Sequence, residues 1–218
     1  MPTDIRTALL EIIERSIELV KYHAIWYELV HPDNQLQYET ILKDYEEFFK
    51  STAHAHFQAI AVTVYQLFEN RKKKDTKSFP YLIDLLEPKD HVFTEKLREM
   101  IEANKSVLGK LFSIRNKVYA HRNATSCPKD IFIKAQVSPG TMTTILALVE
   151  QILSLLTEKV GIESGFNMRI LLLQKADRAR ADLIRIIRTL QETPSNKGIQ
   201  ADAAEPWPGD AHVEPPKQ

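Results

Sequence analysis

The chain has 218 residues, of which 44% are hydrophobic and 27% charged, a balance ordinary for one globular domain with or without a tail. Its 29 basic residues match its 29 acidic residues, which argues against a broad, sequence-independent grip on nucleic acid but not against a local phosphate site. The single cysteine, Cys127, excludes an intrachain disulfide, and we find neither a secretory signal nor an apolar run approaching the ~18–20 residues that span a bilayer. We therefore expect a cytoplasmic protein without membrane contact.

Apolar residues recur with a period near 3.6 along most of the chain, whereas the alternation typical of strands is nearly absent. The pattern predicts helices over about residues 3–30, 36–70, 93–122, 138–161 and 167–191, and a short helix over 80–87. A break near Ser106 could divide the segment 93–122 into two helices, 93–104 and 107–122. The second half of the segment 36–70 is apolar nearly all round, and the basic stretch RKKKDTK after it is typical of a solvated loop. The fold class is therefore all-α, a bundle of about five or six helices with a long central helix.

Local signals mark several boundaries. Ser138 followed by Pro139 is a good N-cap and first-turn pair, and Gly161 is a good helix stop. Turn residues flank IFIKAQV at residues 131–137, which we predict to be extended. From Pro194 onward the chain holds five of its eleven prolines, so we divide it into a helical domain, residues 1–192, and a disordered tail, residues 193–218.

The stretch RNKVYAHR at residues 115–122 carries the candidate chemistry. On a helical wheel Arg115 lies at the edge of the buried face, and His121 lies on a polar row with Lys117. In an unbroken helix, six residues turn through about 600°, so the two side chains would point about 120° apart. They could converge on one phosphate only if the helix unwinds or if a second copy of the chain completes the site.

An arginine, then an asparagine, then a histidine six residues after the arginine, inside an all-α chain, resembles the HEPN superfamily, and RNKVYAHR is most similar to its AbiU-type abortive-infection branch. The resemblance implies a metal-independent endoribonuclease, often a toxin or phage-defence effector, that works as a homodimer on RNA. It implies that His121 acts on the ribose 2′-OH or the leaving oxygen, that Arg115 holds the scissile phosphate, and that Asn116 orients the backbone or the histidine. Asn123 stands where some such toxins carry a tyrosine that a nucleotidyltransferase modifies, so pairing with that antitoxin is in doubt.

The chemistry is sound without the resemblance. RNA supplies its own nucleophile, histidine titrates near neutral pH, and the planar guanidinium of arginine can stabilise charge that builds on a phosphate. We expect no cofactor and no metal, since no His, Asp and Glu set has ligand spacing. An antitoxin protein is a further candidate partner. Candidate binding residues beside the motif are Lys117, Tyr119, Arg122 and His56.

Simpler interpretations stay open. The motif could be a solvated helix end whose Lys117, His121 and Arg122 favour the helix dipole. The same bundle could bind a nucleotide or RNA without cutting it, or could be a helical dimerisation scaffold. His56 could be a histidine at the edge of the core rather than a partner of the cleft. Basic residues on one face of the last predicted helix suit either a phosphate-tracking stripe or a solvated face; they are Lys175, Arg178, Arg185 and Arg188.

Overall fold

The computed structural model describes residues 3–69, 77–120, 136–162 and 167–192. Within these ranges the chain forms nine α-helices, one π-helical turn and no strand, which confirms the all-α prediction. The α-helices are α1 (Thr3–Val30), α2 (Pro32–Gln37), α3 (Glu39–Asp44), α4 (Glu46–Phe68), α5 (Phe79–Leu86), α6 (His91–Ala103), α7 (Lys105–Ile114), α9 (Pro139–Val160) and α10 (Met168–Glu192), and the π-helical turn is η1 (Arg115–Ala120).

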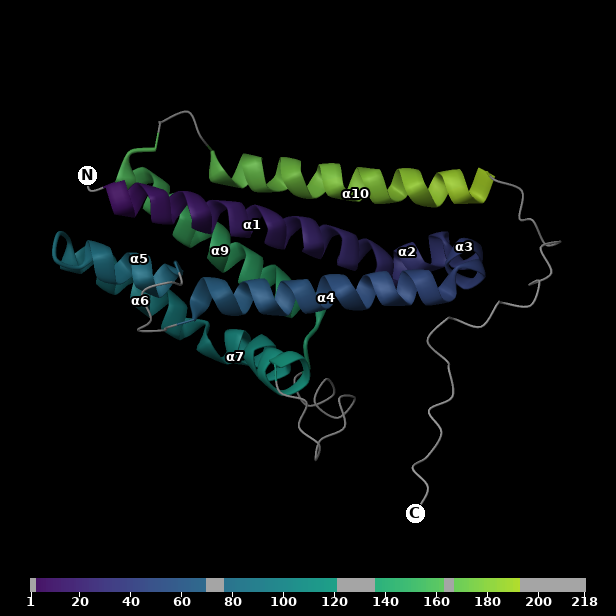
Figure 1. The fold of residues 1–218 in the computed structure, drawn as a ribbon, viewed down its shortest axis with the longest axis horizontal. Helices are drawn as coiled ribbons and strands as arrows, with labels where there is room; N and C mark the ends of the chain where they lie inside the picture. The colour runs from purple at the N-terminus through teal and green to yellow at the C-terminus, as the bar shows by residue number, and fades with distance from the viewer. Residues whose placement is uncertain (1–2, 70–76, 121–135, 163–166, 193–218) are drawn as a thin grey trace, which may run out of the picture.

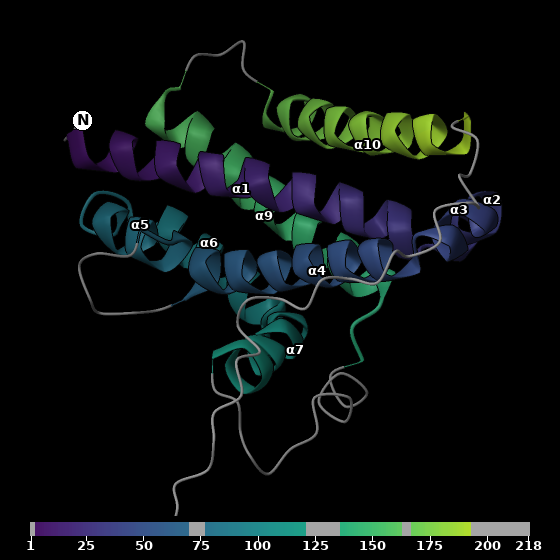
Figure 2. The ribbon, with the colours of Figure 1, turned by 45° about the vertical axis from the view of Figure 1, so that its right-hand side comes forward.

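Helix α1, with 28 residues, is the long central helix of the bundle. It runs between α4 and α10, and α9 crosses behind it, so three long helices cover much of its surface (Figures 1 and 2). Its side chains Leu9, Ile12 and Leu19 have no exposed surface. Helix α7 lies on the side of α4 that is remote from α10, whereas α5 lies beside one end of α4 and also packs against α1. The position of α7 places the candidate motif on the far side of α4 from α10.

The single helix predicted over residues 36–70 is wrong, since this region forms α2, α3 and α4. The junctions fall at Tyr38 and Tyr45, whose backbones leave the helical range with φ/ψ of −111°/16° and −122°/40°. Tyr38 is 5% exposed and belongs to a small apolar cluster that includes Leu29 of α1 and Ile187 of α10. Ile187 lies 149 residues further along the chain than Tyr38. Burying the Tyr38 ring in this cluster outweighs the local preference for one continuous helix.

The predicted boundaries of α9 are confirmed. Ser138 accepts a hydrogen bond from the Thr141 backbone amide and completes a capping box, and Gly161 ends the helix with a left-handed φ of +70°. With 22 residues, α9 is the one helix in the described ranges that is long and apolar enough to cross a membrane, although no such span was predicted. Half of the relevant window is buried in the bundle, where Ile145, Val149 and Ile152 have no exposed surface. We therefore interpret α9 as a core helix.

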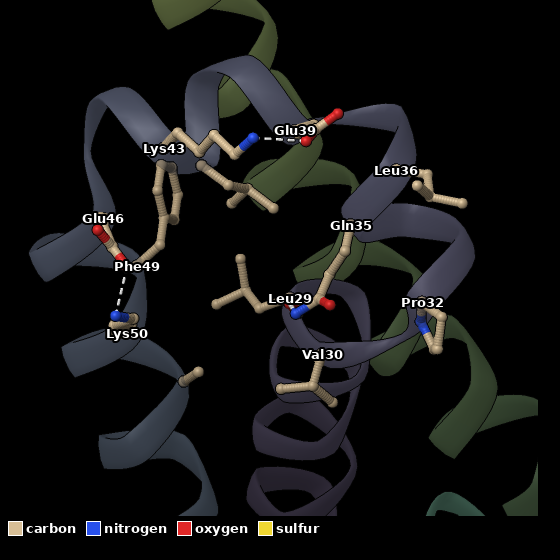
Figure 3. A pocket seen from close by; sticks show the side chains of 12 residues that line it. Leu29, Val30, Pro32, Gln35, Leu36, Glu39, Lys43, Glu46, Phe49 and Lys50 are labelled. Carbon is tan, nitrogen blue, oxygen red and sulfur yellow. Dashed lines mark hydrogen bonds and ion pairs between the residues drawn. The ribbon is translucent and has the colours of Figure 1, made fainter.

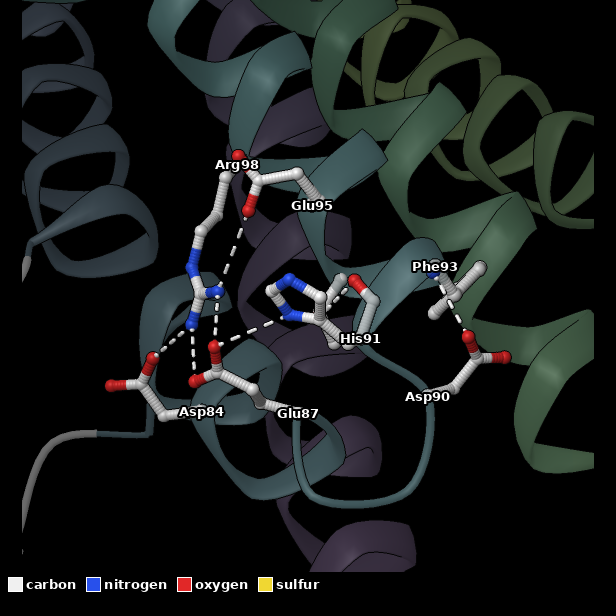
Figure 4. Close-up of polar contacts among 8 residues, drawn as sticks. Asp84, Glu87, Asp90, His91, Phe93, Glu95 and Arg98 are labelled. Atoms are coloured by element: carbon white, nitrogen blue, oxygen red, sulfur yellow. Dashed lines mark hydrogen bonds and ion pairs between the residues drawn. The ribbon is translucent and has the colours of Figure 1, made fainter.

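Arg98 of α6 ties this helix to α5. Its guanidinium donates from Nη1 and Nη2 to the two carboxylate oxygens of Glu87, both at 2.8 Å, and from Nη2 to Asp84 at 3.0 Å (Figure 4). These hydrogen bonds from Arg98 lower the pKa of Glu87. The predicted break near Ser106 falls at Asn104, where α6 ends and α7 begins. The hydrogen bonds of Arg98 to Glu87 and Asp84 fix α6 against α5, and they thereby help to set the position at which α7 begins.

Several predictions fall outside the described residues. These are the basic run at residues 71–74, Cys127, most of the extended segment at 131–137, and the tail at 193–218.

Candidate functional site

The candidate motif begins where α7 changes its winding. Leu108, Leu111 and Ile114 bury one face of α7, with 3%, 0% and 0% exposed. The backbone then continues from Arg115 to Ala120 as a π-helical turn with the sequence RNKVYA. Such turns are rare and occur frequently at functional sites, because the wider winding redirects the side chains that follow. The irregularity coincides with the stretch that the sequence singles out, which makes this stretch the candidate site.

Arg115 lies partly buried at the edge of the core, as predicted. Its guanidinium carbon is 4.0 Å from the centre of the Tyr65 ring, a cation–π contact to α4. Its Nη1 donates to Oδ1 of Asn116 at 2.9 Å. A guanidinium has five N–H donors, and within the described part of the chain this is the one hydrogen bond that the Arg115 side chain makes. The charge is therefore held in place, and the described residues leave most of its donors available.

Tyr65 is itself held from two directions. Its hydroxyl donates to Oε1 of Glu69 at 2.6 Å, and the Phe112 ring of α7 meets it edge-on with 5.2 Å between ring centres. Glu69 is 9% exposed and caps the end of α4, where its carbonyl accepts a hydrogen bond from the Ser78 hydroxyl at 2.9 Å. Tyr65 and Glu69 were not among the predicted site residues. A hydrogen-bonding pair four residues apart on an otherwise apolar helix end was the signal that could have found them.

The structure brings Arg115 and Asn116 together, and the expected role of Asn116 toward His121 stays a prediction because residue 121 lies outside the described part of the chain. The Asn116 side chain oxygen accepts from Arg115, so within the described residues Asn116 orients the arginine. Lys117 is exposed, and Tyr119 belongs to η1 by its backbone while its side chain lies outside the described part. His121 and Arg122 lie outside the described residues, so the structure does not test their placement.

His56 lies elsewhere on α4. Its Nδ1 is 2.7 Å from the Thr52 carbonyl oxygen, and its ring meets that of Tyr22 on α1 edge-on at 5.8 Å. His56 precedes Tyr65 by nine residues, which in a helix is about 13 Å along the axis and about half a turn around it. The structure therefore does not bring His56 to Arg115, and its contacts are those of a histidine between α4 and α1.

The basic residues of α10 are also remote from Arg115, because α10 and α7 lie on opposite sides of α1 and α4 in both views (Figures 1 and 2). Arg180 pairs with the buried carboxylate of Glu28 at 2.6 Å, and Arg185 lies 3.6 Å from Asp182. Within one chain, α10 does not extend the surface that carries Arg115.

A hollow opens where α1, α2, α3 and α4 meet (Figure 3), and its volume is about 660 Å³. Leu29, Val30 and Phe49 line it, while the charged side chains at its edge pair with each other, Lys43 with Glu39 and Lys50 with Glu46. No histidine lines it, and its cations already have partners. It is therefore a poorer candidate for phosphate chemistry than the Arg115 surface. Within the described ranges, no group of three or more His, Cys, Asp and Glu side chains is arranged to hold a metal ion.

An all-α bundle that presents an Arg-Asn pair near the end of a late helix has the architecture of a HEPN domain. The chain belongs to the AbiU2 family of HEPN domains, whose family model matches residues 5–163. The match covers well over half of the chain and includes the whole stretch from Arg115 to His121, whereas α10 lies beyond it. No curated protein and no solved structure matches the chain significantly. The chain is thus a HEPN domain of the type related to abortive infection.

Proposed function

We propose that the chain is a metal-independent endoribonuclease that acts as a toxin or phage-defence effector. The observation that supports this most directly is Arg115, a partly buried cation fixed on an aromatic ring at a π-helical turn, with one side-chain hydrogen bond to the described residues. A fixed guanidinium stabilises the charge that builds on a phosphate during cleavage, because it needs little reorganisation at that moment.

In the proposed reaction the ribose 2′-oxygen attacks the adjacent phosphorus, and the bond from phosphorus to the 5′-oxygen breaks. One imidazole of His121 removes the 2′-OH proton, and the departing 5′-oxygen takes its proton from the second imidazole of a dimer or, where that imidazole is absent, more slowly from water. Arg115 binds the non-bridging phosphate oxygens, and Asn116 orients Arg115. The products carry a 2′,3′-cyclic phosphate and a 5′-hydroxyl.

We further propose a homodimer in which Arg115 and His121 of both copies line one cleft. A two-fold arrangement offers a way to bring an imidazole and a guanidinium to one linkage, because it places two copies of the motif, each with its π-helical turn, at one cleft. Because the proposed substrate is RNA, we also propose that the protein acts in the cytoplasm. An antitoxin protein that masks the cleft is the expected partner.

The test is incubation of the purified protein with total RNA in excess EDTA, beside Arg115→Ala and His121→Ala. We expect cleavage without added metal, a loss of about 10²–10⁴-fold in His121→Ala and of about 10²–10³-fold in Arg115→Ala. His91→Ala, at an exposed histidine of α6, is the matched control and should cleave at the wild-type rate. Wild-type protein that binds RNA but does not cleave it would instead identify a non-catalytic binding module, and protein that does neither would identify a scaffold.

Mixed dimers test the shared cleft. Dimers that contain one Arg115→Ala and one His121→Ala subunit keep one arginine and one histidine, so mixing the two inactive variants should restore part of the activity. No restoration after subunit exchange, verified by tagging, would contradict the composite site.

A further inference from the structure

We propose that Tyr65 and Glu69 of α4 are positioning residues that orient Arg115 for the phosphate, an inference that rests on the proposed function. Neither residue is part of the RNKVYAHR stretch, and neither needs to touch RNA to act. Their effect passes through the guanidinium that lies 4.0 Å from the Tyr65 ring centre.

The contact on Tyr65 holds the arginine by the face of its guanidinium. An arginine side chain has several rotatable bonds, so fixing it in one conformation costs conformational entropy. If the free protein did not already hold Arg115 in place, this cost would add to the barrier of the reaction. A carboxylate in direct contact would order it by occupying its N–H donors, which are the groups that a phosphate needs. An aromatic face orders the charge and leaves those in-plane donors available.

Glu69 and Phe112 make the platform rigid. The Tyr65 hydroxyl donates to Glu69 at 2.6 Å, and the Phe112 ring packs edge-on against the tyrosine ring at 5.2 Å. A phenol that donates to a carboxylate gains electron density in its ring, which strengthens the attraction for a cation above it. Glu69 is 9% exposed, so little water screens this interaction.

A purely structural role explains this arrangement less well. Leu108, Leu111 and Ile114 already bury the inner face of α7. An apolar side chain at position 115 would pack on Tyr65 and Phe112 without the cost of partly desolvating a charge. Position 115 instead carries an arginine, which contacts the Tyr65 ring and donates a hydrogen bond to Asn116. These two contacts fit a site that must keep a guanidinium in one orientation.

The experiment compares kcat and KM for a fluorogenic RNA in EDTA between wild type, Tyr65→Trp, Tyr65→Phe, Tyr65→Leu and Glu69→Gln. Tyr81→Phe, at a partly buried tyrosine of α5, is the matched control. Loss of the aromatic face in Tyr65→Leu should lower kcat by about 2- to 30-fold, the range that a cation–π contact supports. KM should change less, because the arginine acts mainly on charge that develops in the transition state. The kcat values of Tyr65→Phe and Glu69→Gln should fall between those of wild type and Tyr65→Leu. Tyr65→Trp, which keeps an aromatic face, should retain a kcat well above that of Tyr65→Leu.

A double-mutant cycle with Arg115→Ala shows whether Tyr65 acts through the arginine. Once Arg115 is absent, Tyr65→Leu should lower the residual rate by less than twofold. An equal loss with and without Arg115, or a kcat in Tyr65→Leu equal to that of Tyr81→Phe, overturns the inference while leaving the nuclease proposal intact. If Tyr65→Leu does not fold, Tyr65→Met, which keeps the volume without a π face, takes its place. A wild-type protein that neither binds nor cleaves RNA overturns both proposals.

Discussion

Acid should destabilise this fold through His23. Its ring lies on α1 beside Trp26 and Tyr27, with 6.0 and 5.7 Å between ring centres. Its Nε2 is buried and has no hydrogen-bond partner in the described part of the chain. Burial lowers the pKa of His23 from 6.5 to about 4, because the charged imidazolium loses water without gaining a partner.

The direction of the effect follows from proton binding. In the unfolded chain the imidazole has its ordinary pKa near 6.5, so between about pH 6.5 and 4 the unfolded state binds more protons than the folded state. Stability contributed by neutral His23 is therefore complete above this window and is lost as the pH falls through it. From these two pKa values, the free energy of unfolding should be about 2 kcal/mol lower at pH 5 than at pH 7 through this residue alone.

Urea unfolding at pH 7 and pH 5 measures the effect, with His23→Phe as the variant that cannot titrate. The loss between the two pH values should be about 2 kcal/mol smaller in His23→Phe than in wild type. His91→Gln, whose side chain is 72% exposed in the native chain, controls for the removal of a histidine as such. Equal losses in wild type and His23→Phe would refute the argument, and so would an NMR titration of the His23 ring with a midpoint near 6.5.

Three further predictions concern stability. Gly161→Ala should destabilise the fold by about 1 kcal/mol in thermal or urea unfolding, because φ is +70° and residues with a Cβ disfavour this left-handed conformation; Gly161→Asn should cost less, since asparagine tolerates it better. Equal stability would contradict this interpretation of the helix end. Ser138→Ala should cost about 1 kcal/mol through loss of the cap on Thr141, whereas Ser138→Asp should retain most of it. Arg180→Ala should cost more, about 2–3 kcal/mol, because it removes the cationic partner of the 1%-exposed carboxylate of Glu28, and adding Glu28→Gln should recover part of the loss; a strictly additive double variant would show that the pair is not coupled.

Much of the helical pattern could be predicted from local chemistry. The limits of α1 match the predicted 3–30, and α9 begins after Ser138 and ends before Gly161 as expected. These boundaries depend on residues that act within one turn of the backbone, a capping hydroxyl or a glycine that tolerates positive φ. The break at Tyr38 was missed because its cause, the burial of the ring against α10, is not local.

The candidate site divides in the same way. Arg115 and Asn116 could be identified because they are adjacent in a short string and lie at the edge of an apolar stripe, which one helical wheel displays. Tyr65 precedes Arg115 by fifty residues, and no periodicity links two helices that far apart. The separation of His56 from Arg115 likewise needed the packing of α4 against α1.

The order of residues alone therefore determined that the chain is helical, where most helices begin and end, and which arginine carries the candidate chemistry, since hydrogen bonds within a turn and apolar periodicity are encoded over a few neighbours. Only the tertiary structure decided that the helix changes its winding at Arg115, that a tyrosine ring of α4 supports the guanidinium, and that α10 lies on the opposite side of the bundle. Those features depend on which apolar faces bury one another, and contacts between distant segments are settled together by the packing of the whole core.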